Sequence, residues 1–141
     1  MPSDIVVSLA CICGDAGTKT LGRMLKSVIE RPEGSLVDEI VIGWNGKDDV
    51  QFSEALSEGI NYKAFGIQED FMALPPGVNQ SIDYDCDKVA VRIIRQEWQN
   101  DFSVVRNETF KHARGEYILW LDTDDIVASA ADLTGRDGLQ A

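Results

Sequence analysis

The feature that most constrains the fold is the unbroken apolar character of the predicted strands. Residues 5–13 read "IVVSLACIC", a continuous run rich in β-branched side chains. A strand with one wet face alternates apolar and polar residues, whereas a strand of a parallel sheet, buried on both faces, does not. Residues 38–44, "DEIVIGW", and 116–121, "EYILWL", repeat this character. The sequence therefore predicts a parallel sheet that is covered on both sides.

Helical patterns lie between these runs. Pro32 and Gly34 lie beyond the end of the first predicted helix. This helix is indicated by five apolar residues at helical spacing, Leu21, Met24, Leu25, Val28 and Ile29. A short helix is expected over 52–59, strands over 61–67 and 89–98, and a helix from Asp101 as N-cap to Gly115. The alternation predicts an α/β fold, a mostly parallel sheet flanked by helices.

Composition limits the classes of ligand. The 141 residues are enough for one domain, expected to span 1–141, with 60–88 as a variable insertion or loop. A net charge of −11 disfavours nucleic acid, and any anionic ligand would need a metal ion, helix N-termini or arginines beside it. The sequence shows neither a secretory signal nor an apolar run long enough to cross a membrane, so we expect a cytoplasmic protein.

Three aspartates, Asp122, Asp124 and Asp125, directly follow the strand predicted over 116–121. Ligands of open α/β sheets bind at the carboxyl ends of the strands. Close carboxylates repel one another, and a hard divalent cation with a preference for oxygen ligands would keep them ionised together. The alternative is an acidic loop that caps a following helix.

The cysteines and the histidine give little indication of a metal site or a catalytic site. Cys11 and Cys13 would face the same side of a strand, and with Cys86 they form no metal-ligand spacing, so buried reduced thiols are expected. His112 is the only histidine, which disfavours Ser-His-Asp and Cys-His mechanisms.

Residues 97–125, "EWQNDFSVVRNETFKHARGEYILWLDTDD", resemble the donor-site core of family 2 glycosyltransferases with the GT-A fold. That family carries a pattern like D-F-x-x-x-R-N, then a helix, then G-[ED]-[YW]-I-L-x-L-D-x-D-[DE]. Residues 5–50 are similar to its opening strand, first helix and second strand, in the same order. The resemblance implies a Rossmann-like GT-A donor-binding half.

The resemblance also implies roles for single residues. Asp122 and Asp124 match the D-x-D, which binds the donor's ribose and, through Mn²⁺ or Mg²⁺, its diphosphate. Asp125 matches a third acidic position. Arg106 and Asn107 match the R-N pair, whose arginine lies near the nucleotide.

The resemblance also implies residues that lie beside the base of the donor nucleotide. Asp15 matches the polar end of the first strand's loop. Many relatives place a base-contacting aspartate after the second strand, where this chain has Trp44 and Asn45. Asn45 can hydrogen-bond a base edge and Trp44 can stack on a base, or Trp44 is buried and Asn45 belongs to a turn.

The implied reaction moves a sugar from a nucleoside-diphosphate donor to an acceptor hydroxyl. It would be of the hexosyltransferase type and inverting, with a UDP-sugar favoured over a GDP-sugar and a glycan, lipid or protein as acceptor. Only 16 residues follow Asp125. We therefore interpret the chain as a truncated GT-A domain that lacks the acceptor half and the general base, and expect self-association through an exposed sheet edge.

Two other classes place acids at strand ends. A haloacid-dehalogenase phosphatase has a D-x-D, but there it opens the domain and needs a downstream lysine, and no lysine follows Lys111. A non-catalytic flavodoxin-like module of the receiver type draws its acids from separate strands. Metal-dependent nucleotide binding would distinguish the glycosyltransferase from both.

Overall fold

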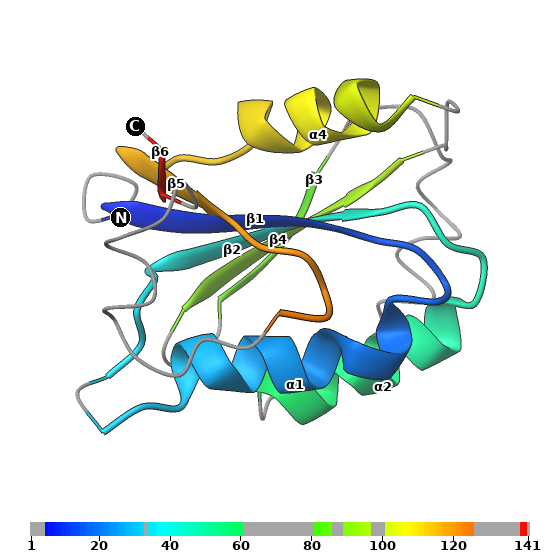
Figure 1. Ribbon diagram of the computed structural model, residues 1–141, viewed down its shortest axis with the longest axis horizontal. Coiled ribbons are helices and arrows are strands. Elements are labelled where there is room, and N and C mark those ends of the chain that lie inside the picture. Colours follow the sequence, from blue (N-terminus) through cyan, green and yellow to red (C-terminus); the bar gives the residue numbers. More distant parts are fainter. Residues whose placement is uncertain are drawn as a thin grey trace.

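The computed structural model describes residues 5–32, 34–60, 81–85, 89–96, 101–125 and 139–140. Their strands form one sheet in the order β3-β4-β2-β1-β5-β6 (Figure 1). The four central strands are parallel to one another: β1 (Val7–Cys13), β2 (Glu39–Trp44), β4 (Ala90–Arg95) and β5 (Tyr117–Trp120). The two edge strands, β3 (Ser81–Asp85) and β6 (Leu139–Gln140), pair antiparallel with β4 and β5.

Helices cover both faces of this sheet. α1 (Thr18–Ile29) and α2 (Asp49–Ile60) lie side by side on one face, and α4 (Phe102–Lys111) lies on the other (Figure 1). The predicted α/β fold with a mostly parallel sheet is confirmed, and the arrangement agrees with a Rossmann-like GT-A domain.

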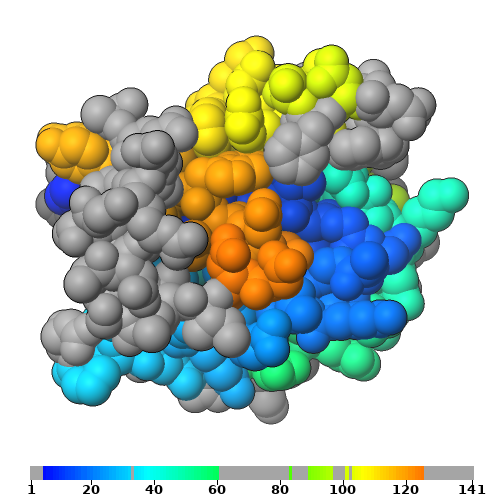
Figure 2. Space-filling view, viewed as in Figure 1, coloured from blue at the N-terminus to red at the C-terminus, as the bar shows by residue number. Residues whose placement is uncertain are grey.

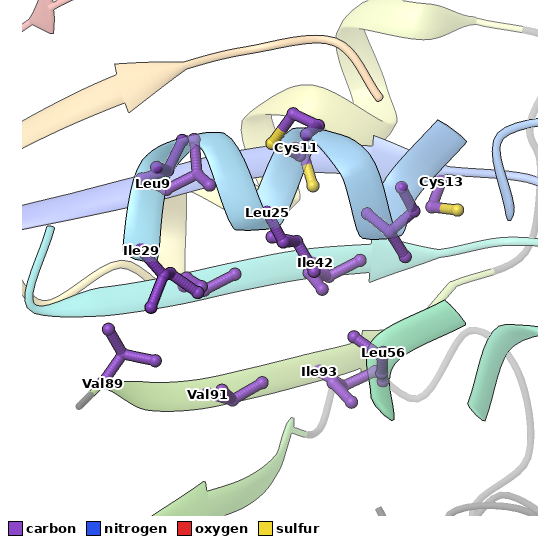
Figure 3. Packing of buried hydrophobic residues seen from close by; sticks show 14 of the residues in the cluster. Leu9, Cys11, Cys13, Leu25, Ile29, Ile42, Leu56, Val89, Val91 and Ile93 are labelled. Atoms are coloured by element: carbon purple, nitrogen blue, oxygen red, sulfur yellow. The ribbon is translucent and has the colours of Figure 1, made fainter. Parts of the chain in front are cut away.

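The core explains why the strands read as continuous apolar runs. β2 is buried along its whole length, and the α1 face of the sheet packs against the apolar stripe of α1 (Figure 3). Leu9, Cys11 and Cys13 of β1 meet Leu25 and its neighbours there, all of them fully buried. Each buried side chain of this size contributes roughly 1.5–3 kcal/mol, which fixes α1 against the sheet.

Several boundaries depart from the sequence prediction, and the strand expected over 89–98 is observed as β4, which ends at Arg95. α2 begins at Asp49, ahead of the expected 52–59. The expected helix over 101–115 ends at Lys111, because the next residues turn toward β1 and β2. β3 lies inside the segment 60–88 that we interpreted as a loop or insertion; the rest of that segment, including the predicted strand 61–67, lies outside the described residues.

A buried polar network closes the amino-terminal edge of the sheet. Glu39 is fully buried and accepts hydrogen bonds from Oγ of Ser8 at 2.8 Å and from the backbone N–H of Arg114 at 2.8 Å. The Arg114 guanidinium pairs with its other oxygen, and the N–H of Gly115 donates to Oγ of Ser8 at 2.9 Å. The connection from α4 to β5 is thereby fixed to β1 and β2.

Candidate functional site

The order of the strands places the candidate site at the opposite edge. From β1 the chain moves to β2 and β4 on one side, and then returns through α4 to β5 on the other side of β1. Such a switch point opens a crevice outside the carboxyl ends of the two strands, here β1 and β5. The loops that leave these two strands meet there, and Figure 2 shows the segment after β5 (orange) beside the start of α1 (blue).

The loop after β5 is a closed turn over residues 122–125. The backbone N–H of Asp125 donates to the carbonyl of Asp122 at 3.1 Å. In return, the N–H of Asp122 donates to Oδ2 of Asp125 at 2.9 Å. Asp122, Asp124 and Asp125 are all exposed, and we call this segment the acidic turn.

The acidic turn gathers negative charge. The pKa of the Asp122 carboxyl is raised, first by partial burial and then by the charges of Asp125 and Asp124. Within the described ranges, no three His, Cys, Asp or Glu side chains are already grouped as a metal-binding cluster. The oxygen donors nevertheless fit Mg²⁺ or Mn²⁺, since such ions keep part of their coordination for water and substrate phosphates.

Asp15 joins the two neighbouring loops. Its Oδ1 accepts hydrogen bonds from the backbone N–H groups of Lys47 and Asp48, both at 2.9 Å. Asn45 directly follows β2; its N–H donates to the carbonyl of Cys13 at 3.0 Å, and the residue is partly exposed. The structure thus brings Asp15 and Asn45 to the same edge as the acidic turn. Their roles at a base stay predictions.

Trp44 is buried, which settles the two interpretations of this residue. Its ring stacks on Phe52 with centroids 4.2 Å apart and planes at 7°, and its Nε1 donates to Oδ1 of Asp49 at 2.7 Å. Arg95 pairs with the other oxygen of Asp49 at 3.1 Å. Trp44 therefore anchors the start of α2 and presents no ring face for a base.

Arg106 and Asn107 take different positions on α4. Asp101 is the N-cap of α4, and its side chain accepts from the N–H of Ser103 at 3.0 Å, which fixes the start of the helix. The Arg106 guanidinium lies 5.9 Å from the ring centroid of Trp120, at the end of β5. Its Nε is buried without a hydrogen-bond partner in the described structure, whereas Asn107 is exposed.

The expected buried thiols are confirmed for Cys11 and Cys13. Burial, helped by the charge of Asp15, raises the pKa of Cys13 to about 12. Burial also raises the pKa of Cys11. Cys86 lies outside the described residues, as does the helix that the acidic turn was alternatively expected to cap.

Sequence reasoning missed two residues of the site, Thr123 and Gly17. A methyl group on Gly17 would lie 2.9 Å from Oγ1 of Thr123, so the side chain of Thr123 lies close to Gly17. The only sequence signal was the glycine at position 17, just before a predicted helix, and it does not indicate that Thr123 lies beside it.

The sequence pattern of Glycosyl transferase family 2 matches residues 82–133, which contain β4, α4, β5 and the acidic turn. Over this segment the chain is similar to family 2 glycosyltransferases. The match includes Arg106, Asn107 and all three aspartates, and it favours this family over the phosphatase and the flavodoxin-like module.

Other comparisons add little. No curated protein matches the sequence. Among solved structures, S. aureus TarS 1–349 matches with a TM-score of 0.49 and 16% identity over 92% of this chain. The chain spans 31% of that structure, and a likeness at this level carries no argument about activity. None of the described helices is long and apolar enough to cross a bilayer.

Proposed function

We propose that this chain is part of a metal-dependent glycosyltransferase, and that it binds the nucleoside-diphosphate sugar donor at the carboxyl ends of β1 and β5. The observation that carries the proposal is the acidic turn: three exposed aspartates lie at the switch point of the sheet, inside the segment that matches the family.

Asp122 and Asp124 would hold Mn²⁺ or Mg²⁺. Asp124 has no hydrogen-bonding or ionic partner among the described residues, whereas Asp125 already uses Oδ2 to close the turn. Asp125 would therefore contribute at most its other oxygen. The bound ion would offset the charge that gathers on a diphosphate leaving group.

Groups of the chain itself would also favour the diphosphate. α1 and α4 both begin at this edge, and helix N-termini attract anions. The buried Nε–H of Arg106, near the end of β5, has no hydrogen-bond partner among the described residues, and an unpaired buried donor gains most from a new acceptor. These features compensate locally for the net charge of −11.

The finer assignments follow from the family resemblance. We propose a UDP-sugar as donor, with Asp15 and Asn45 at the base, and inverting transfer of a hexose. A GDP-sugar is the second candidate donor, because no described aspartate follows β2 at the position that many relatives use.

Calorimetric titration of UDP in the presence of Mn²⁺ tests the proposal. We expect binding that EDTA abolishes, that is weaker with GDP, and that Asp124→Asn reduces by about tenfold or more. The matched control is Glu116→Gln, which removes one exposed charge just before β5, at the far edge of the sheet. Failure of the folded chain to bind either nucleotide, or binding that survives EDTA, contradicts the proposal.

A further inference from the structure

Thr123, the residue between the two aspartates of D-x-D, lies directly against Gly17. A methyl group at Gly17 would lie 2.9 Å from Oγ1 and 3.3 Å from Cγ2 of Thr123. It would also lie 3.3 Å from Sγ of Cys13. The first distance is shorter than side-chain carbons adopt in folded proteins, so Thr123 occupies space that only a glycine at position 17 leaves open.

Both partners of this contact are held by their own backbone. Gly17, the N-cap of α1, donates its N–H to the carbonyl of Gly14 at 3.1 Å, and its carbonyl accepts from the N–H of Leu21 at 3.0 Å. Thr123 lies inside the acidic turn, which two hydrogen bonds between Asp122 and Asp125 close. A displacement of Thr123 therefore moves the flanking carboxylates with it.

We propose that Thr123 is a positioning residue: its fit against Gly17 sets the place of the acidic turn relative to the N-terminus of α1. The inference rests on the proposed function, because the turn would there share a diphosphate with that helix. Binding constellations have to be held within about 0.5 Å. The overlap at Gly17 would force a shift of comparable size, because atoms 2.9 Å apart must separate.

The rival role for Thr123 is chemical, with its hydroxyl as a ligand of the metal or nucleotide. Valine distinguishes the two, since it keeps the branched shape and removes the hydroxyl. If Thr123 acts by its shape, Thr123→Val binds UDP with Mn²⁺ within about twofold of the wild type, and Thr123→Ala binds about threefold more weakly.

A double-mutant cycle tests the contact. We expect Gly17→Ala to weaken UDP binding by about tenfold or more, and the double variant Gly17→Ala/Thr123→Ala to return to within about threefold of Thr123→Ala, because the smaller side chain restores the space. Amide resonances of residues 122–125 should move in Gly17→Ala and return in the double variant. Gly59→Ala, which crowds α1 against α2 away from the turn, serves as the control that loses stability without losing affinity.

The two readouts separate this inference from the proposed function. A wild-type chain that binds no UDP with Mn²⁺ refutes the proposed function, and the resonances then still decide whether Gly17 sets the place of the turn. Resonances that stay in place in Gly17→Ala overturn the inference. So does a double variant that binds no better than Gly17→Ala, and so does a Thr123→Val variant that loses binding, since the hydroxyl would then be the active group.

Discussion

Replacing Arg114 by methionine should destabilise the fold strongly without touching the candidate site. The Arg114 guanidinium pairs with Glu39, a carboxylate with no exposed surface at the amino-terminal edge of the sheet. Arg114→Met keeps most of the side-chain volume and the backbone N–H that donates to Glu39. The change therefore removes the guanidinium charge together with its hydrogen bond to Glu39.

The expected loss is about 2 kcal/mol in the free energy of unfolding. Stranding one partner of a buried ion pair costs about 3–5 kcal/mol. Two features reduce this figure here: the Arg114 side chain is 27% exposed, and Glu39 keeps its hydrogen bonds from Ser8 and from the Arg114 backbone. With a urea dependence of roughly 2 kcal/mol per molar, the midpoint should fall by about 1 M.

Urea unfolding of three variants measures this. Lys111→Met is the control, because Lys111 is 73% exposed and pairs with Glu108 only at 3.5 Å, so it should cost less than about 0.5 kcal/mol. Adding Glu39→Gln to Arg114→Met removes the stranded charge and should recover about 1 kcal/mol. An Arg114→Met protein as stable as the wild type, or a double variant less stable than Arg114→Met, would refute the reasoning.

Two further perturbations test the packing. Gly59→Ala would place a methyl group 2.8 Å from Cβ of Leu25 and 3.0 Å from the backbone of Gly22. The overpacking should cost about 1–3 kcal/mol, which exceeds the gain of about 1 kcal/mol in helix propensity, so the melting temperature should fall. An unchanged melting temperature would contradict this close crossing of α1 and α2. In a Cys86→Ser background, the thiol of Cys13 should react with a disulfide reagent at pH 8 only as fast as the protein unfolds, because its pKa is raised to about 12. Since this folded-state pKa lies above the ordinary 9.0, the associated stability is complete below pH 9 and is lost as the pH rises toward 12; rapid labelling of the folded protein would show the burial to be wrong.

The strands of the central sheet could be predicted because burial on both faces is a local property of composition. β1, β2 and β5 lie where unbroken apolar runs occur, and α1 where the helical stripe does. β3 could not be recognised in the same way. It is an antiparallel edge strand, and its Asp83 forms an ion pair with Arg92 of β4 at 2.8 Å. Such an edge shows no continuous apolar run.

Long-range contacts explain the other departures. Gly115 is a plausible helix stop, yet α4 ends at Lys111, since the N–H groups of Arg114 and Gly115 bind Glu39 and Ser8, far away in the sequence. Trp44 allowed two interpretations for a similar reason: only its stacking on Phe52 decides that it is buried. At the site, the aspartates were evident from their spacing, whereas Thr123 mattered only once Gly17 was beside it.

The polar groups at the two edges of the sheet differ in how far they are hydrogen-bonded. At the amino-terminal edge, the buried Glu39 accepts hydrogen bonds from Ser8 and Arg114, an arrangement that adds rigidity. At the carboxyl edge, Asp124 is exposed and the buried Nε of Arg106 lacks a partner among the described residues. Buried polar groups that lack a partner are those that gain most from binding. This asymmetry favours the acidic turn as the binding surface over the other edge of the sheet, and it predicts that Arg114→Met will lower stability while the affinity for UDP with Mn²⁺ stays unchanged.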